Sequence, residues 1–353
     1  MMKSRLASWT LAHFAVDMSC FYILYRGVEN VFHADPLTIG QAILLYNCIA
    51  FGLQMIFGYF ADKHQKTDKV LGTIGLTAML VPLAIIWVSQ NATASWISLI
   101  ICALLNAAFH VGGGMDVLKT SEGRISPSGI FVSSGALGVI LGTLYGKTGN
   151  GALLPIAVVA IASILLFVTT QKQADGSSPT QIKPITLLTK YGTGVITLCL
   201  FIAVFIRSYA GIIWPIGFEK TGLLILLPAV SSCLGKALGG LVADRFGALE
   251  TAVASLALSM VLLWICPGSW LVTGISILFF NMAMPITLCG LATAMPSHPG
   301  FAFGLSTFAL LLGYIAYTFG IANNNPIYII TILGITAILL IALSLRRKTT
   351  KSS

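Results

Sequence analysis

The hexapeptide G-Y-F-A-D-K at 58–63 returns as G-L-V-A-D-R at 240–245, about half the chain later. Both copies share Gly, Ala, Asp and a basic residue, and each follows a long apolar run. One copy alone would be an ordinary tight turn. Their recurrence at equivalent places predicts a chain built from two related halves with parallel topology.

Around these two copies the sequence is strongly apolar. Of its 353 residues, 57% are hydrophobic and only 9% are charged, and the mean hydropathy is +0.92. An average soluble domain is about 25% charged, and a soluble core could not hide so much apolar surface. This composition argues against soluble enzymes and nucleic-acid-binding proteins. Apolar runs of about 20 residues predict an all-α integral membrane protein, with twelve transmembrane helices in two six-helix halves.

The only long polar stretch divides these runs into two sets. We expect an N-terminal six-helix half at 1–170, a cytoplasmic linker at 171–190 and a C-terminal six-helix half at 191–353, because the linker carries Gly, Ser and Pro at its centre. Basic residues mark the cytoplasmic side of membrane proteins. With both termini in the cytoplasm, fifteen Lys and Arg residues fall on that side and three fall outside. The net charge of +9 therefore needs no acidic partner.

The two hexapeptides resemble the repeated motif of the major facilitator superfamily, G-x-L-a-D-r-x-G-r-k. The stretches L-A-H-F-A-V-D at 11–17 and A-F-H at 108–110 resemble its fosmidomycin-resistance-like branch. That branch follows A-F-H with Pro and an acid, whereas this chain has Val111 and Gly112, so no role of that acid carries over. The resemblance implies the major facilitator fold, with a central site lined by the first, fourth, seventh and tenth spans. It also implies alternating access, in which the two halves rock about that site.

Ionisable side chains inside the spans are the best guide to a site, because they are costly in hydrocarbon and usually face a cavity or a partner. His13 and Asp17 are four residues apart and share one face of the first span. Asp17 lies about 18 Å along the helix from Arg5, near mid-membrane. It is a candidate for proton exchange, with a plain hydrogen-bonding role as the alternative.

His110 in the fourth span is a further candidate for the proton or substrate pathway, and simple packing is its alternative role. Imidazole and carboxylate also suit divalent cations, so His13, Asp17 and His110 could together bind one. They do not form a tight ligand motif, and the sequence predicts no metal site.

The seventh span contributes the clearest cation. Arg207 presents a planar set of donors that could bind an anionic substrate group or the carboxylate of Asp17. Its alternative is to extend toward the outer membrane surface. Asn281 in the tenth span is a weaker candidate for the lining of the same cavity. Lys236 lies about 12 Å from the cytoplasmic end of its span, and we expect it to extend its stem to the cytoplasm, with a role in the cavity as the alternative.

The repeated turns supply a second group of candidates. Asp62 and Asp244 end two helices beside Lys63 and Arg245, where they can form ion pairs or meet the N-terminus of a facing helix. In the superfamily such contacts hold the two halves together when the cytoplasmic side is shut. The resemblance therefore implies a gating role for these four residues.

The sequence thus predicts a monomeric secondary transporter in the plasma membrane, with both termini in the cytoplasm. The resemblance points to export of small drug-like or anionic organic compounds, driven by a proton gradient and by no other cofactor. The chain carries no phosphate-binding P-loop and no H-E-x-x-H or G-x-S-x-G motif, so ATP-driven transport and hydrolysis are not expected. Two alternatives stay open: a membrane sensor that binds without transport, and a divalent-metal transporter that uses His13, Asp17 and His110.

Overall fold

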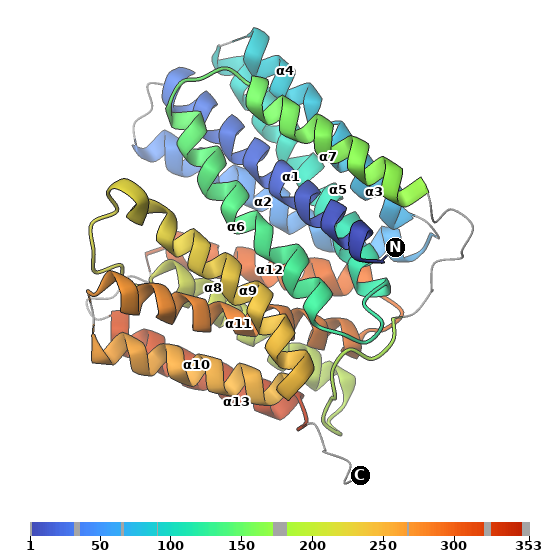
Figure 1. Cartoon of the computed structure of the whole chain (residues 1–353), viewed down its shortest axis with the longest axis vertical. Helices are drawn as coiled ribbons and strands as arrows, with labels where there is room; N and C mark the ends of the chain where they lie inside the picture. Colours follow the sequence, from blue (N-terminus) through green and yellow to red (C-terminus); the bar gives the residue numbers. More distant parts are fainter. Residues whose placement is uncertain are drawn as a thin grey trace.

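The chain folds almost entirely into helices, as seen in a computed structural model (Figure 1). The structure describes residues 2–31, 36–64, 67–89, 91–171, 182–266, 268–320 and 326–347. Its helices are α1 (Met2–Val31), α2 (Pro36–Asp62), α3 (Thr67–Thr77), α4 (Leu80–Val88), α5 (Ala92–Lys119), α6 (Ser126–Lys147), α7 (Leu153–Gln171), α8 (Thr193–Ile212), the short 3-10 helix η1 (Gly222–Leu226), α9 (Leu227–Phe246), α10 (Ala248–Ile265), α11 (Trp270–Ala294), α12 (Pro299–Thr318) and α13 (Pro326–Ser344).

Twelve spans follow from these helices. Within the described residues, eleven segments are long and apolar enough to cross a membrane, and α1 is not among them. We count α1 as the twelfth span because it is 30 residues long and packs along α5 and α6 in the same bundle. Helices α3 and α4 form one span, Thr67–Val88. They are separated because Pro82 has no N–H to donate back to Ala78, which instead accepts from Val81 at 2.9 Å. The predicted all-α architecture is confirmed.

The two halves form separate bundles. In Figure 1 helices α1–α7 (blue to green) lie above α8–α13 (yellow to red). The bundles meet chiefly where α2 packs on α12 and where α6 packs on α9. Glycine makes the first contact close, because a Cβ on Gly58 would overlap the backbone of Gly300, and one on Gly304 would overlap that of Met55. Small residues let helix backbones touch in this way inside membranes.

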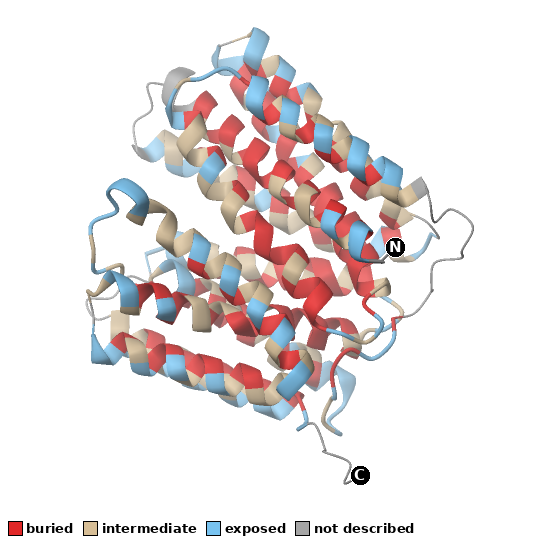
Figure 2. Cartoon of the chain, in the orientation of Figure 1, coloured by how far each residue is buried: buried red, intermediate tan, exposed pale blue. Residues whose placement is uncertain are grey.

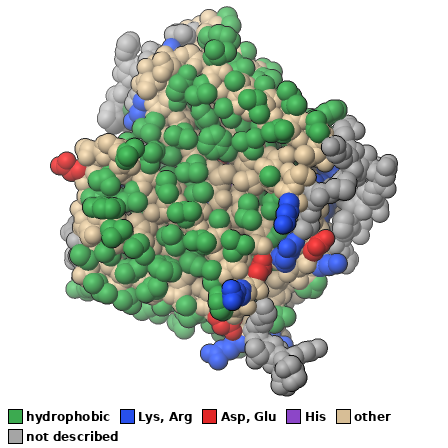
Figure 3. Space-filling model, in the orientation of Figure 1, with side chains coloured by type: hydrophobic (Ala, Val, Ile, Leu, Met, Phe, Trp, Pro, Cys, Tyr) green, Lys and Arg blue, Asp and Glu red, His purple; other side chains and the backbone are tan. Residues whose placement is uncertain are grey.

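The outer surface is apolar, as contact with lipid requires. Large apolar side chains are exposed along the outer helices, among them Ile164 and Phe167 of α7 and Leu339 of α13. Figure 2 places the buried residues along the inner helix faces, and Figure 3 shows apolar side chains spread over one whole face. A water-soluble protein would not expose so much apolar surface. The chain is a multi-pass membrane protein.

An even number of spans returns both ends of the chain to the same side of the membrane. We call this side, which holds the start of α1 and the end of α13, the terminal side; it is the side predicted to be cytoplasmic. The other side is called the opposite side.

The second part of the predicted linker packs on the C-terminal half. Leu187 accepts from the N–H of Arg346 at 2.8 Å, and the N–H of Thr189 donates to Ser344 at 3.0 Å. Ile182 and Ile185 are buried. Residues 182–190 therefore extend the C-terminal half, because their spaced apolar side chains find a surface there. The polar part of the predicted linker, 172–181, lies outside the described residues.

Candidate functional site

The two repeated turns meet facing helix N-termini on the terminal side. The carboxylate of Asp62, at the end of α2, accepts hydrogen bonds from the backbone N–H groups of Gly300 and Phe301, both at 2.8 Å. These groups open α12, in the other half of the chain. A helix N-terminus carries unpaired N–H groups and a partial positive charge, so it favours a carboxylate.

The second copy makes the reciprocal contact. Asp244, at the end of α9, accepts from the N–H groups of Ile125 (2.6 Å) and Ser126 (3.0 Å), where α6 begins. Each half thus offers one carboxylate to the other half, and we call these two contacts the latch. The neighbouring basic side chains lie against aromatic rings: Lys63 over Tyr59 at 4.1 Å and Arg245 near Phe246 at 5.3 Å.

The latch makes a testable prediction about the balance between conformations. Asp62→Asn or Asp244→Asn should favour opening of the terminal side by about 1–3 kcal/mol, roughly 5- to 150-fold. A cysteine introduced at Ser128, which is 1% exposed, would report this opening by faster reaction with a thiol reagent. Transport should also slow in both variants.

Glu122→Gln is the matched control, because Glu122 is an exposed acid in the turn before α6, and we expect it to leave labelling unchanged. If both asparagine variants showed the labelling rate and the transport rate of the parent, the latch would have a structural role only.

A cluster of polar side chains lies inside the N-terminal half. Asp17 of α1 accepts from the amide of Asn106 on α5 at 3.1 Å. Nε2 of His13 lies 3.2 Å from Asp17, and Nε2 of His110 lies 3.7 Å from it. All four side chains are buried. The structure therefore brings together the three ionisable residues that the sequence singled out in the first and fourth spans, and adds Asn106.

The hydrogen bonds of the cluster fix the histidine tautomers. A carbonyl oxygen only accepts, so Nδ1 of His13 donates to Phe131 (2.7 Å) and Nδ1 of His110 donates to Asn106 (3.0 Å). In neutral imidazoles this leaves both Nε2 atoms as acceptors, yet they are 2.9 Å apart beside the Asp17 carboxylate. A hydrogen bond between them requires one additional proton. The arrangement therefore suits one shared proton between the two Nε2 atoms.

The same atoms are arranged as metal ligands would be. Each of the three residues His13, Asp17 and His110 offers one ligand atom, and these atoms lie within 4.8 Å of one another. Both imidazoles are oriented by backbone carbonyls at Nδ1, as metal-binding histidines commonly are. Three protein ligands leave a fourth position open. The geometry thus suits either a shared proton or a divalent cation.

The cationic candidate lines a cavity in the C-terminal half. This cavity has a volume of about 330 Å³ and extends to Ile216 and Pro228, at the opposite-side ends of α8 and α9. Its polar lining is Arg207, Ser208, Ser232, Lys236 and Asn281, and its apolar lining includes Trp214, Phe280 and Met284. Two predicted pathway residues, Arg207 and Asn281, therefore share one cavity.

Arg207 is held without a carboxylate partner among the described residues. Its Nη2 donates to the carbonyl of Phe280 at 3.4 Å, and its Nη1 donates to Thr287 at 3.5 Å. Its Nε is buried and makes no hydrogen bond, and the guanidinium carbon lies 5.4 Å from the centre of the Phe280 ring. These bonds are long for a charged donor. A bound anion would supply the acceptors that the protein does not.

The pairing of Arg207 with Asp17, considered from the sequence, is not formed in this conformation. Asp17 contacts His13 and Asn106, whereas Arg207 contacts Phe280 and Thr287. The two groups belong to separate sites in separate halves.

Lys236 differs from the expectation. Instead of extending to the terminal side, it lines the cavity with Arg207 and lies within electrostatic range of both Arg207 and Asp17. The reason is helix packing: α9 presses this face against α6, where the Lys236 carbonyl contacts Gly129. Distance along the helix specifies how far Lys236 lies from the end of α9, but not the direction of its side chain.

The sequence did not reveal a second buried charge network. Asp116 of α5 pairs with Arg5 and accepts from the indole of Trp9 at 2.7 Å. Nearby, Asp68 pairs with Lys119 at 3.0 Å. Both acids lie beside the apolar runs and not within them: Asp68 stands just before one run, and Asp116 just after another. Val111, Met115 and Leu118 recur at the spacing of one helix face, and this pattern could have placed Asp116 inside the bundle.

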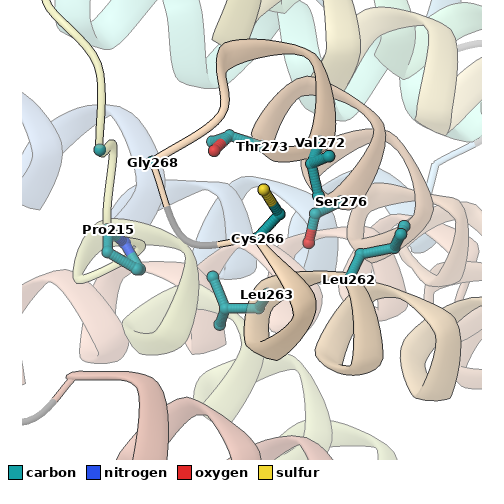
Figure 4. Close-up of a pocket in the computed structure, with 9 residues that line it drawn as sticks. Pro215, Leu262, Leu263, Cys266, Gly268, Val272, Thr273 and Ser276 are labelled. Carbon is teal, nitrogen blue, oxygen red and sulfur yellow. The ribbon is translucent and has the colours of Figure 1, made fainter.

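A smaller cavity lies at the opposite-side end of the C-terminal half (Figure 4). It has a volume of about 260 Å³, and its described lining carries no charged side chain. The segment after α8 separates it from the Arg207 cavity, since Pro215 faces the small cavity while Trp214 and Ile216 face the large one. The thiol of Cys266 lies among the labelled side chains of Figure 4. This cavity is not part of the charged site.

Comparisons with known proteins identify the fold. Neither the comparison with protein families nor that with curated proteins gives a match. Among solved structures, the chain is similar to FucP, a major facilitator superfamily transporter, in its outward conformation: identity is 12%, the TM-score is 0.62, and 96% of this chain and 99% of that one are covered. A variant of the E. coli fucose:proton symporter FucP gives 12% identity, a TM-score of 0.67 and 99% coverage of both chains.

The human organic anion transporter MFSD10 (TETRAN) gives 13% identity and a TM-score of 0.69, with 96% of this chain and 98% of that one covered. At such identities the likeness establishes the fold alone. The chain has the fold of the major facilitator superfamily transporters, as the repeated motif led us to expect.

Proposed function

We propose that this chain is a secondary transporter of the major facilitator superfamily that works by alternating access. The observation that carries the proposal is the pairing of a latched terminal side with a cationic cavity reaching toward the opposite side. This arrangement suits the outward-facing state of an alternating-access cycle. Rocking of the halves would break the latch and turn the cavity toward the cytoplasm.

The substrate we propose is a small organic anion. Arg207 and Lys236 supply two positive charges, and no carboxylate is among the described residues that line the cavity. Trp214 and Phe280, whose ring centres are 4.6 Å apart, would pack against an apolar or aromatic body. A cavity of this size suits a drug-like molecule. That a fold neighbour transports organic anions is consistent with this class.

Proton exchange would drive the cycle, with the Asp17 cluster as its site. The 2.9 Å approach of the His13 and His110 Nε2 atoms supports this assignment, and Lys236 could relay the charge of the cluster to the substrate cavity. The resemblance to the fosmidomycin-resistance-like branch favours export by antiport across the plasma membrane, with the termini in the cytoplasm. The protein would act as a monomer, with no cofactor besides the proton gradient.

Flux in proteoliposomes tests the proposal. The purified protein should exchange a radiolabelled organic anion for the same unlabelled anion, and a pH gradient of antiport polarity should drive its accumulation. Neutral sugars of similar size should not compete. Accumulation with the opposite polarity would replace antiport by symport, and binding without any flux would favour a sensor.

A divalent cation is the second candidate cargo, because the ligand atoms of His13, Asp17 and His110 converge within 4.8 Å. Uptake of Zn²⁺ or Mn²⁺ into the same liposomes would support this alternative. No metal flux, together with anion exchange, would exclude it.

A further inference from the structure

A third cavity lies at the terminal side, between the ends of α1, α5, α6 and α9. Its volume is about 400 Å³. Three basic side chains line it: Lys3 and Arg5 at the start of α1, and Arg124 in the turn before α6. Lys3 is exposed, Arg5 is buried against Asp116, and Arg124 makes a long, exposed contact of 3.9 Å with Glu122. Among the described residues that line the cavity there is no carboxylate.

The wall deeper in the membrane is apolar. Leu6, Ala7 and Ile130 line it from the N-terminal half, and Leu241 lines it from the C-terminal half. Leu241 is 49% exposed, so this wall opens on the lipid-facing surface and not on the interior of the bundle. The cavity therefore has a cationic rim at the helix ends and an apolar floor about one turn farther in. An occupant must carry a negative head and an apolar chain.

We propose that this cavity binds an anionic phospholipid from the leaflet on the terminal side. The phosphate would lie between Lys3 and Arg124, and an acyl chain would run along Ile130 and Leu241. Basic pockets between transmembrane helices on the cytoplasmic side commonly hold anionic lipid head groups. A soluble phosphate would meet the same cations but would leave the apolar wall without a partner.

The bound lipid favours the latched conformation. The cavity is completed where the two halves meet: Leu241 lies one turn before Asp244, and Ser126, which donates to Asp244, also lines the cavity. When the terminal side opens, Leu241 moves away from α1 and α6, and the apolar wall loses its described residue from the C-terminal half. A lipid that binds one of two states shifts the balance toward that state. This regulation goes beyond the proposed transport function and is measurable without any substrate.

Lipid retention by the full-length protein tests the binding. Purified protein is mixed with phosphatidylglycerol or phosphatidylcholine of equal chain length, and bound lipids are counted by native mass spectrometry. We expect one phosphatidylglycerol to bind more tightly than phosphatidylcholine, and Lys3→Ala/Arg124→Ala to weaken it at least tenfold. The matched control is Lys183→Ala/Lys190→Ala, which removes two exposed lysines outside the cavity. Equal loss in both double variants, or no preference in the parent, would overturn the proposal.

The conformational effect has a separate test. In nanodiscs, replacing a quarter of the phosphatidylcholine by phosphatidylglycerol should slow labelling of the Ser128→Cys reporter several-fold. In the Ala7→Trp variant, whose indole fills the apolar wall, the labelling rate should be the same with and without phosphatidylglycerol. Glycerol phosphate in solution should not mimic the lipid. A lipid effect that persists in both Ala7→Trp and Lys3→Ala/Arg124→Ala would show that the lipid acts elsewhere.

Discussion

Replacing Asp17 by asparagine is expected to abolish proton-driven accumulation of substrate while leaving substrate-for-substrate exchange intact. With one proton exchanged per substrate, the parent should accumulate about tenfold for each pH unit of gradient. The new side-chain amide fits the same space, but it lacks the negative charge that would stabilise a proton shared by His13 and His110. The variant should therefore equilibrate substrate without concentrating it, as measured in liposomes with an imposed pH gradient.

Asn106→Ala is the matched control for this experiment. It removes the hydrogen bond to Asp17 but keeps the carboxylate, so accumulation should persist at a reduced rate. Exchange activity reports that each variant is folded. If the Asp17→Asn variant concentrated substrate as well as the parent, Asp17 would have only a structural role.

Arg207→Lys should impair transport nearly as strongly as Arg207→Ala. Lysine keeps the charge but loses the planar fork that would bind an anion from two nitrogens while packed beside Phe280. Hydrogen bonds to charged groups are worth about 1.5–3 kcal/mol, so we expect the apparent affinity for the anion to fall roughly 10- to 150-fold. Binding titration and the apparent KM for exchange both measure this loss.

Arg347→Lys, at an exposed position beyond the end of α13, controls for a general effect of exchanging arginine for lysine. It should leave the affinity unchanged. An unimpaired Arg207→Lys variant would mean that any positive charge in the cavity suffices, and Lys236 would then become the main candidate for the anion.

The fold was predictable because its determinants are local or repeated. Span length follows from bilayer thickness, and the two copies at 58–63 and 240–245 imply the duplication. The break between α3 and α4 was not predicted, although Pro82 was visible, because apolar composition continues through it. The packing of residues 182–190 on the C-terminal half was also not predicted, because a few apolar side chains that become buried stand within a mostly polar stretch.

The site was predictable only in part. The sequence shows the candidate residues, but it does not show which residues from distant parts of the chain contact them. The spacing of His13 and Asp17 placed them on one face, but only tertiary packing brings His110 to them, 97 positions away along the chain. The position of Lys236 along its helix was predictable, but the direction of its side chain was not. The pair of Arg5 and Asp116 joins two helix ends that lie outside the apolar runs. In each case the contact depends on how a helix is rotated about its own axis within the bundle, and hydropathy carries little information about that rotation.

The latch has a consequence for how this sequence can change over time. Asp62 and Asp244 are bound by backbone N–H groups, so any residue except proline can stand at positions 301 and 126 and still donate. Substitutions at the donor positions 301 and 126 leave the backbone N–H groups in place, whereas a change at an aspartate cannot be rescued by a compensating side chain across the interface. The two aspartates should therefore be fixed without covarying partners. Phe301→Pro, which deletes a single donor, would imitate half the loss of Asp62.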